Sequence, residues 1–179
     1  MRNDLNVSTG DLVAVNAVTK VFPSSRGMSD VHALGPLDLS MRAGEFFAVV
    51  GPSGCGKSTL LEVIAGLTRP TSGQVFFNGV PVGDFVPEGI GVIFQEDASF
   101  PWLSVRENIA FGRPDASLAE IEAAAAAVGA TPFIAALPEG IETQVGERGV
   151  QLSAGQRQLV AFARALLAEP RILILDEAT

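Results

Sequence analysis

The chain has little cysteine, little positive charge and no long apolar run, and each shortage excludes a class of protein. Its single cysteine, Cys55, excludes an internal disulfide and fits a reducing compartment. Two lysines and a net charge of −8 argue against a basic surface for nucleic acid. No apolar run approaches the roughly 18 residues of a membrane span, and the N-terminus lacks the apolar stretch of a signal peptide. We expect a soluble domain, or one that reaches a membrane only through a partner.

Short apolar runs separated by turn signals predict an α/β fold. Hydrophobic residues make up 47% of the 179 residues, enough for one domain with a subdomain. The segments 12–22 and 31–45 each predict a strand, the second followed by a turn. Asn78-Gly79 between apolar stretches is typical of a type I′ hairpin. The first eighty residues are therefore predicted to form antiparallel hairpins.

Capping-box spacing predicts two helices further along the chain. Ser117 and Glu120 open the first helix, which Gly129 ends. Ser153 and Gln156 open the second helix, which ends before a proline. The predicted apolar stripe of the second helix is Val160, Ala163, Leu166 and Leu167. Helices thus fill the later part of the chain, with α/β elements on either side.

The densest cluster of signals is GPSGCGKS, residues 51–58, which fits the spacing of a phosphate-binding loop. Its glycines permit positive φ, so the freed N–H groups can form an anion nest. A helix beginning near Lys57 adds its positive dipole end. Lys57 would bridge the β- and γ-phosphates, the Ser58 hydroxyl would ligate Mg²⁺, and Thr59 would touch the α-phosphate. The alternative is a glycine-rich turn before a helix.

The flanking sequence favours the phosphate-binding interpretation. EFFAVV, residues 45–50, is a continuous apolar run, typical of a strand buried on both faces. The next segment predicts a helix whose apolar stripe is Leu60, Leu61, Ile64 and Leu67. Strand, loop and helix follow in the required order. Cys55, inside the loop, is interpreted as a small tolerated side chain rather than a nucleophile.

Acidic and amide side chains follow two predicted buried strands. The strand in ILILDE ends in Asp176 and Glu177, and the strand in GIGVIFQ ends in Gln95. Ligands of parallel sheets bind at the carboxyl ends of strands. Asp176 would hold Mg²⁺, Glu177 would orient or deprotonate the attacking water, and Gln95 would bind Mg²⁺ and that water. A solvated acid pair and a surface amide are the competing interpretations.

The stretch LSAGQRQ, residues 152–158, suggests a second phosphate site at a helix N-terminus. The Ser153 hydroxyl and the Gly155 N–H lie where an anion would bind. One chain already has a complete phosphate loop, so a second site would serve the nucleotide of another chain. This suggests a head-to-tail pair of chains with ATP between them. An ordinary capped helix is the competing interpretation.

Taken together, these motifs resemble the ATP-binding subunit of ABC transporters over essentially the whole chain. GPSGCGKS resembles the Walker A loop, Gln95 the Q-loop, LSAGQ the signature motif, ILILDE Walker B with its catalytic glutamate, and Phe22 the aromatic position that stacks on adenine. The resemblance implies catalytic roles for Glu177 and Gln95 and metal ligation by Ser58, Gln95 and Asp176. It implies nucleotide binding by Phe22, Gly51, Pro52, Ser53, Gly54, Cys55, Gly56, Lys57, Ser58, Thr59, Ser153, Gly155 and Gln156.

The resemblance also implies a fold, partners and a location. The fold is an α/β P-loop NTPase (RecA-like) core with an N-terminal antiparallel β subdomain and an inserted α-helical subdomain. The helical subdomain would span about 97–169, and the β subdomain and core about 1–96 and 170–179. ATP and Mg²⁺ are the implied cofactors. The partners are a second ATP-binding subunit, membrane permease subunits and, for an importer, a solute-binding protein, at the cytoplasmic face of the cell membrane.

Two departures from the family pattern affect this interpretation. The family continues past Walker B with a D-loop and a switch histidine, whereas the single histidine here, His32, is interpreted as a surface or strand residue. We therefore expect a C-terminally truncated domain, which as a fragment would bind nucleotide with little turnover. Residues up to about 103 resemble nitrate, sulfonate and taurine importer ATPases, and the later part resembles exporters. The sequence is also compatible with an exporter ATPase, a non-transport ABC ATPase or a P-loop NTPase of a different class.

Overall fold

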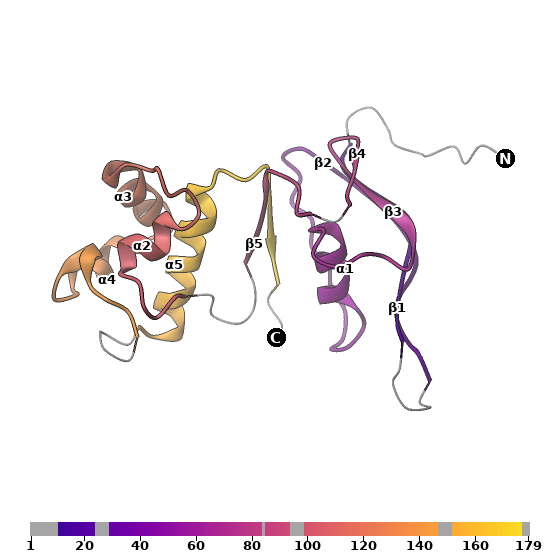
Figure 1. Ribbon diagram of the computed structural model, residues 1–179, viewed down its shortest axis with the longest axis horizontal. Coiled ribbons are helices and arrows are strands. Elements are labelled where there is room, and N and C mark those ends of the chain that lie inside the picture. The colour runs from indigo at the N-terminus through magenta and orange to yellow at the C-terminus, as the bar shows by residue number, and fades with distance from the viewer. Residues whose placement is uncertain (1–10, 24–28, 84, 94–98, 147–151, 177–179) are drawn as a thin grey trace. The chain divides into compact units, whose positions relative to one another are not determined.

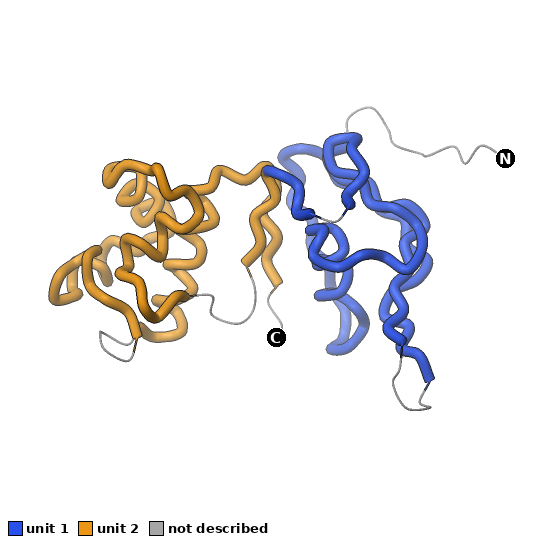
Figure 2. The backbone as a smooth tube through the Cα atoms, viewed as in Figure 1, with its two compact units in different colours: residues 1–88, 178–179 blue, residues 89–177 orange. Residues whose placement is uncertain are grey.

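The computed structural model describes residues 11–23, 29–83, 85–93, 99–146 and 152–176. They form two compact units, which Figure 2 shows in blue and orange. The first unit extends to residue 88 and the second runs from residue 89 to residue 177. The division predicted from the sequence, into 1–96 with 170–179 and 97–169, stays a prediction.

The first unit is an antiparallel sheet with one helix. Along the chain its elements are β1 (Asp11–Phe22), β2 (Val31–Arg42), α1 (Lys57–Ile64), β3 (Ser72–Phe77) and β4 (Val80–Pro81) (Figure 1). The strand order is β2-β1-β3-β4. The hairpins expected from the sequence are confirmed: β1 pairs with β2, and β3 pairs with β4 through Asn78 and Gly79, whose φ angles are 52° and 76°. Positive φ at both central residues is what a type I′ turn requires.

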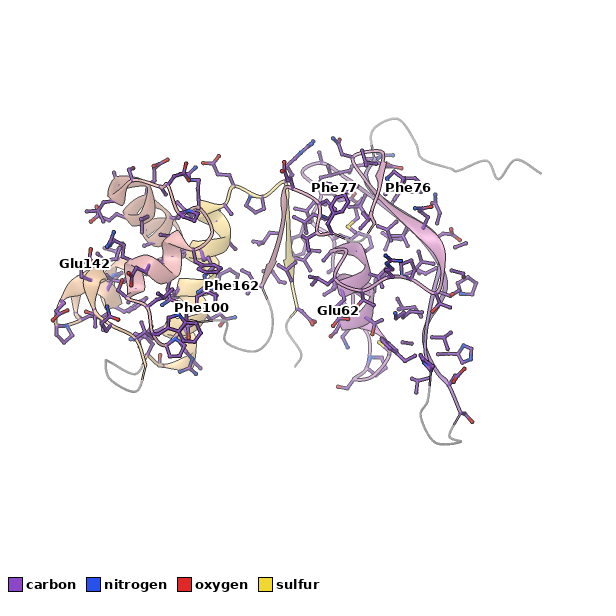
Figure 3. The ribbon with its side chains drawn as sticks, in the orientation of Figure 1. Glu62, Phe76, Phe77, Phe100, Glu142 and Phe162 are labelled. Atoms are coloured by element: carbon purple, nitrogen blue, oxygen red, sulfur yellow. The ribbon has the colours of Figure 1, made fainter. Side chains whose placement is uncertain are left out.

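The core of the first unit lies around β1, the sheet strand that pairs with both β2 and β3. Val13, Val15 and Val18 of β1 are almost completely buried. They are joined by residues of β3, among them Phe76 and Phe77, which are labelled in Figure 3. Helix α1 contributes Leu60, Val63, Ile64 and the following Ala65. These contacts hold α1 against β1 and β2.

The predicted buried strand at residues 45–50 is wrong for this structure. These residues have no regular secondary structure and belong to neither of the two described sheets. Phe46 and Val50 are 92% and 91% exposed. An apolar run becomes a strand only where neighbouring strands satisfy its N–H and C=O groups. No described segment pairs with 45–50, so the run stays irregular and exposed.

The second unit combines a parallel strand pair with a helical cluster. Strands β5 (Ile90–Ile93) and β6 (Ile172–Leu175) pair in parallel, with Ile93 opposite Leu175. The helices are α2 (Val105–Ala110), α3 (Leu118–Ala127), α4 (Thr131–Ala135), the 3₁₀ turn η1 (Gly140–Glu142) and α5 (Ala154–Leu167). The core of the cluster includes Val105, Ile109 and Ile121, packed against Val160 and Ala163 of α5. None of the helices in the described part of the chain has the length and apolarity of a membrane span.

Capping boxes begin three of these helices. The two predicted boxes, at Ser117 for α3 and Ser153 for α5, are confirmed, and a third opens α2 at Ser104. Beyond the end of α3, Gly129 has φ 74°, and the Ala130 N–H donates to Ala125 O at 2.9 Å. This is the bond pattern of a Schellman ending, so the predicted glycine stop is also confirmed.

The predicted apolar stripes and buried strands need correction at single positions. Helix α1 ends at Ile64, so Leu67 lies beyond it and is 44% exposed. In α5 the buried stripe is Val160, Ala163 and Leu167, whereas Leu166 is exposed. In β6 only Ile174 is buried, and in β5 only Ile93. Within the described ranges β5 and β6 pair only with each other, so these strands are covered less than a central strand of a larger sheet.

Candidate functional site

The loop before α1 has the backbone expected of a phosphate-binding loop. Gly54 and Gly56 take φ angles of 78° and 95°, and Gly56 is the N-cap of α1. A Cβ on Gly56 would come within 2.3 Å of the Ala33 carbonyl oxygen in β2. No side chain can cap the helix at a glycine, so the N–H groups of its first turn face whatever occupies the loop. The helix begins at Lys57, as predicted.

The Lys57 ammonium group lies back over the loop that precedes it. Its Nζ donates to Gly51 O at 2.9 Å and to Pro52 O at 3.0 Å. Lys57, at the end of the glycine-rich stretch, is therefore bonded to the start of the stretch through two neutral carbonyl acceptors. A phosphate oxygen would offer it a charged acceptor, and charge-assisted bonds are roughly twice as strong as neutral ones.

The remaining loop residues divide by exposure. Pro52, Ser53 and Cys55 are exposed, whereas Ser58 and Thr59 lie half-buried in the first turn of α1. A Cβ on Gly51 would come within 2.7 Å of the Cys55 Sγ. The thiol therefore occupies the space that the glycine leaves, which fits the prediction that Cys55 is a tolerated small side chain.

Phe22, predicted to stack on adenine, lies at the last position of β1. The residue is 40% exposed, and the Lys20 ammonium group lies 4.8 Å from the centroid of its ring. The segment after α1 fastens this strand end, because the Val21 N–H donates to Thr71 Oγ1 at 2.9 Å and the Thr71 N–H donates to Thr19 O at 2.8 Å. Phe22 is thus an exposed aromatic ring on a fixed backbone, as base stacking requires.

In the second unit, Asp176 directly follows β6, as predicted. Asp176 is half-buried, and its N–H donates to Ile93 O at 3.0 Å. The side chain therefore begins at the carboxyl end of the parallel pair, where ligands of parallel sheets bind. Gln95 and Glu177, the two predicted catalytic residues, lie outside the described residues.

The start of α5 carries the second predicted phosphate site. Ser153 N donates to Gln156 Oε1 at 2.8 Å, and Gln156 N donates to Ser153 Oγ at 3.3 Å. The hydroxyl accepts one bond in this box and retains its proton for donation. Gly155 is exposed, and a Cβ there would meet nothing within 4 Å. No described residue therefore excludes a side chain at this position. Glycine inside a helix costs roughly 0.5–1 kcal/mol relative to alanine, so the packing of the described residues gives no reason for a glycine here.

The sequence interpretation missed one polar group in the second unit. Asn108 of α2 is completely buried and bonds to both the segment 100–104 and Arg164 of α5. Burial lowers the pKa of the Arg164 guanidinium group. The sequence does mark the start of α2, because Ser104 and Glu107 have the S-x-x-E spacing of a capping box directly before Asn108. Trp102, in the same segment, is 71% exposed.

The uncapped helix start, the two left-handed glycines and the lysine define a nucleotide-binding domain of the P-loop class. A family model described as ABC transporter matches residues 34–179. The chain belongs to the ABC transporter family and is an ATP-binding, ATPase-type domain of it.

Similar proteins include exporters and B-family members. The chain is 46% identical over 180 residues to ABC transporter B family member 1 of Arabidopsis thaliana, covering 98% of this chain. It is 42% identical over 176 residues to the ATP-dependent lipid A-core flippase of Chromobacterium violaceum, covering 96% of this chain. It spans only 14% and 29% of the lengths of these two proteins.

A solved structure shows the same fold. The structure of a bacterial Atm1-family ABC exporter with ATP bound has a TM-score of 0.80 and 36% sequence identity to this chain. The matched region covers 94% of this chain and 29% of the exporter chain. The exporter-type relatives match nearly the whole sequence, including its first part. The predicted importer character of residues up to about 103 is therefore not supported, nor is a solute-binding protein as partner.

Proposed function

We propose that this chain binds Mg-ATP at the loop 51–59 and hydrolyses it to drive export by an ABC transporter. The observation that carries the proposal is the position and conformation of Gly56 at the start of α1. It caps α1 in the left-handed conformation, against the Ala33 carbonyl oxygen, where any side chain would collide. Because no side chain caps this helix start, its first N–H groups remain available to bind an anion.

The loop residues would divide the work of binding. The backbone of residues 51–56 and the Lys57 ammonium group would surround the phosphates, with Thr59 on the α-phosphate. Pro52, Ser53 and Cys55 would line the loop through their backbone. On binding, Lys57 would exchange its bonds to Gly51 O and Pro52 O for bonds to phosphate oxygens. Phe22 would stack on the adenine ring.

The metal and catalytic roles fall to oxygen-bearing side chains. Ser58, Gln95 and Asp176 offer a hydroxyl, an amide and a carboxylate oxygen, the hard ligands that Mg²⁺ prefers. When bound, Mg²⁺ neutralises charge on the phosphates. Glu177 would accept a proton from the attacking water, which Gln95 would orient.

The start of α5 would act on the nucleotide of a second chain. The Ser153 hydroxyl retains a proton to donate, Gly155 leaves open space in front of the helix, and Gln156 holds the cap. An exposed helix N-terminus, with a glycine and a hydroxyl at its start, fits a close approach by a phosphate from outside the chain. We propose a head-to-tail pair of chains, each contributing a loop to one nucleotide and an α5 start to the other.

Export and membrane association rest on the relatives. The named relatives are transporters whose own lengths are several times that of this chain. We propose that the domain works at the cytoplasmic face of a membrane, joined to membrane-spanning domains. Exposed Trp102 and the segment around it are candidates for contact with such a domain.

Lys57→Ala tests the proposal. Losing a charged partner costs about 1.5–3 kcal/mol, so the dissociation constant for Mg-ATP in calorimetry should rise roughly 10- to 150-fold. Arg42→Ala is the matched control, because it removes one exposed cation from the same unit without touching the loop. Unchanged affinity in Lys57→Ala, or equal losses in both variants, would refute the assignment of the loop.

A further inference from the structure

Asn108 fastens the segment 100–104 to α2. Its Oδ1 accepts the Phe100 N–H at 2.8 Å, and its Nδ2 donates to Phe100 O and Ser104 O, each at 3.0 Å. A further contact from Nδ2 reaches Leu103 O at 3.3 Å. Asn108 is completely buried, so each of these bonds is made away from water. One amide therefore sets the path of the chain that enters α2.

Arg164 of α5 completes the same group. Its Nε donates to Asn108 O at 2.7 Å, and its Nη2 donates to Asn108 Oδ1 at 2.9 Å. The guanidinium carbon lies 4.7 Å from the centroid of the Phe100 ring, which is labelled in Figure 3, and 6.0 Å from that of Phe111. The planar guanidinium group thus donates to both the backbone and the side chain of Asn108, while the Phe100 ring packs against its face.

The backbones of the two helices also meet at this point. A Cβ on Gly112, just after α2, would come within 2.4 Å of Arg164 O. Nothing larger than glycine fits there without moving one of the helices. The crossing of α2 and α5 is therefore fixed at Arg164 by a polar clamp and a close backbone approach together.

The segment 100–104 is fastened on a second side, by the chain that leads toward α5. Val105 N donates to Thr143 O at 3.0 Å, and Val145 N donates to Leu103 O at 3.1 Å. Ser104 and Gln144 form an isolated antiparallel bridge. The segment 100–104 thus contacts both α5, where the Phe100 ring meets Arg164, and residues 143–145.

We propose that Arg164 is a positioning residue for ATP-driven pairing of two chains, because it holds the start of α5 in a fixed relation to the segment 100–104. This inference rests on the proposed function. Arg164 lies eleven positions after Ser153, about 16 Å along the helix at 1.5 Å per residue. It acts at a distance from the start of α5, through the rigid helix, and does not touch the nucleotide.

Arg164→Lys keeps the charge but removes the fork, and it is the variant to test. The assay is sedimentation velocity with Mg-ATP in the Glu177→Gln background, which stops turnover. We expect Arg164→Lys to require at least a tenfold higher protein concentration to pair. Its dissociation constant for Mg-ATP, measured by calorimetry, should stay within about twofold of the parent's, because the phosphate loop lies in the other unit.

Val160→Ala is the matched control for stability. Val160 is completely buried in the same helix and takes no part in the clamp, so the variant weakens the packing of α5 alone. It should pair like the parent below its melting temperature. If Arg164→Lys is unfolded at the assay temperature, Phe100→Leu, which removes the covering ring, takes its place with the same expected shift.

Three outcomes would overturn the inference. Arg164→Lys pairing at the parent's concentration would do so, and so would a loss in Val160→Ala equal to that in Arg164→Lys. A double variant Arg164→Lys with Asn108→Asp whose losses simply add would show that the two residues do not act as one unit. Failure of the parent to bind Mg-ATP would instead refute the proposed function.

Discussion

Replacing Gly56 and Gly54 separately by alanine distinguishes two costs of a side chain in the phosphate loop. One is the left-handed backbone conformation, and the other is a collision with β2. Both glycines have left-handed φ angles, 95° and 78°, so alanine at either position costs roughly 1–2 kcal/mol of backbone energy. A Cβ on Gly54 would meet nothing within 4 Å, so that variant carries the backbone cost alone.

Gly56→Ala adds a collision. The new Cβ would lie 2.3 Å from Ala33 O and 3.0 Å from Leu34 Cδ2, the first of these about 1 Å inside ordinary contact. Ala33 O is a backbone atom of β2, held by the pairing of β2 with β1, so relief requires the start of α1 to move or the strand pair to open. Overpacking of this kind costs about 1–3 kcal/mol.

We therefore expect Gly56→Ala to lose about 2–5 kcal/mol of unfolding free energy and Gly54→Ala about 1–2 kcal/mol. Urea unfolding of the nucleotide-free chain, followed by far-ultraviolet circular dichroism, measures both losses. The same displacement of α1 should weaken Mg-ATP binding in Gly56→Ala. Equal losses of stability in the two variants would refute the argument that β2 supports the loop.

Three further predictions concern other parts of the chain. Glu177→Gln should bind Mg-ATP like the parent but retain an ATP-bound pair in gel filtration, and hydrolysis at the parental rate would contradict the role of Glu177 as base. Phe22→Ala should weaken ATP binding by about 1–3 kcal/mol and leave inorganic tripolyphosphate binding unchanged, both measured by calorimetry, whereas equal losses would rule out base stacking. The Ser104 backbone N–H and hydroxyl hold the pKa of Glu107 below its ordinary value of 4.5. The stability from this depressed pKa is present above pH 4.5 and is lost as the pH falls through the folded pKa, so Glu107→Gln should destabilise at pH 7 and cost progressively less as the pH falls through the folded pKa, whereas a pH-independent loss would contradict the shift.

Local signals predicted local structure correctly. Asn78-Gly79 predicted its hairpin because positive φ is a property of those two residues, and the boxes at Ser117 and Ser153 formed because each closes within four residues. The left-handed φ angles of Gly54 and Gly56 likewise follow from the glycines themselves. Each of these features is decided by neighbours along the chain.

The errors arose where a distant partner decides the outcome. Phe46 and Phe47 are apolar enough for a central strand, but no described strand pairs with them, so composition alone predicted burial that is not observed. Leu166 fits the helical period of α5, yet it is 42% exposed. The clamp between Asn108 and Arg164 joins residues 56 positions apart, and no local pattern marks such a bond.

Trp102 gives the chain an intrinsic optical probe. The sequence contains one tryptophan and no tyrosine, so its emission on excitation at the red edge of the indole band reports a single position. Trp102 is 71% exposed and its ring centroid lies 5.6 Å from that of Phe100, against which the Arg164 guanidinium group also packs. A soluble quencher such as iodide will reach this indole freely until another protein surface covers it. Quenching can therefore follow the docking of a partner on this segment without any added label.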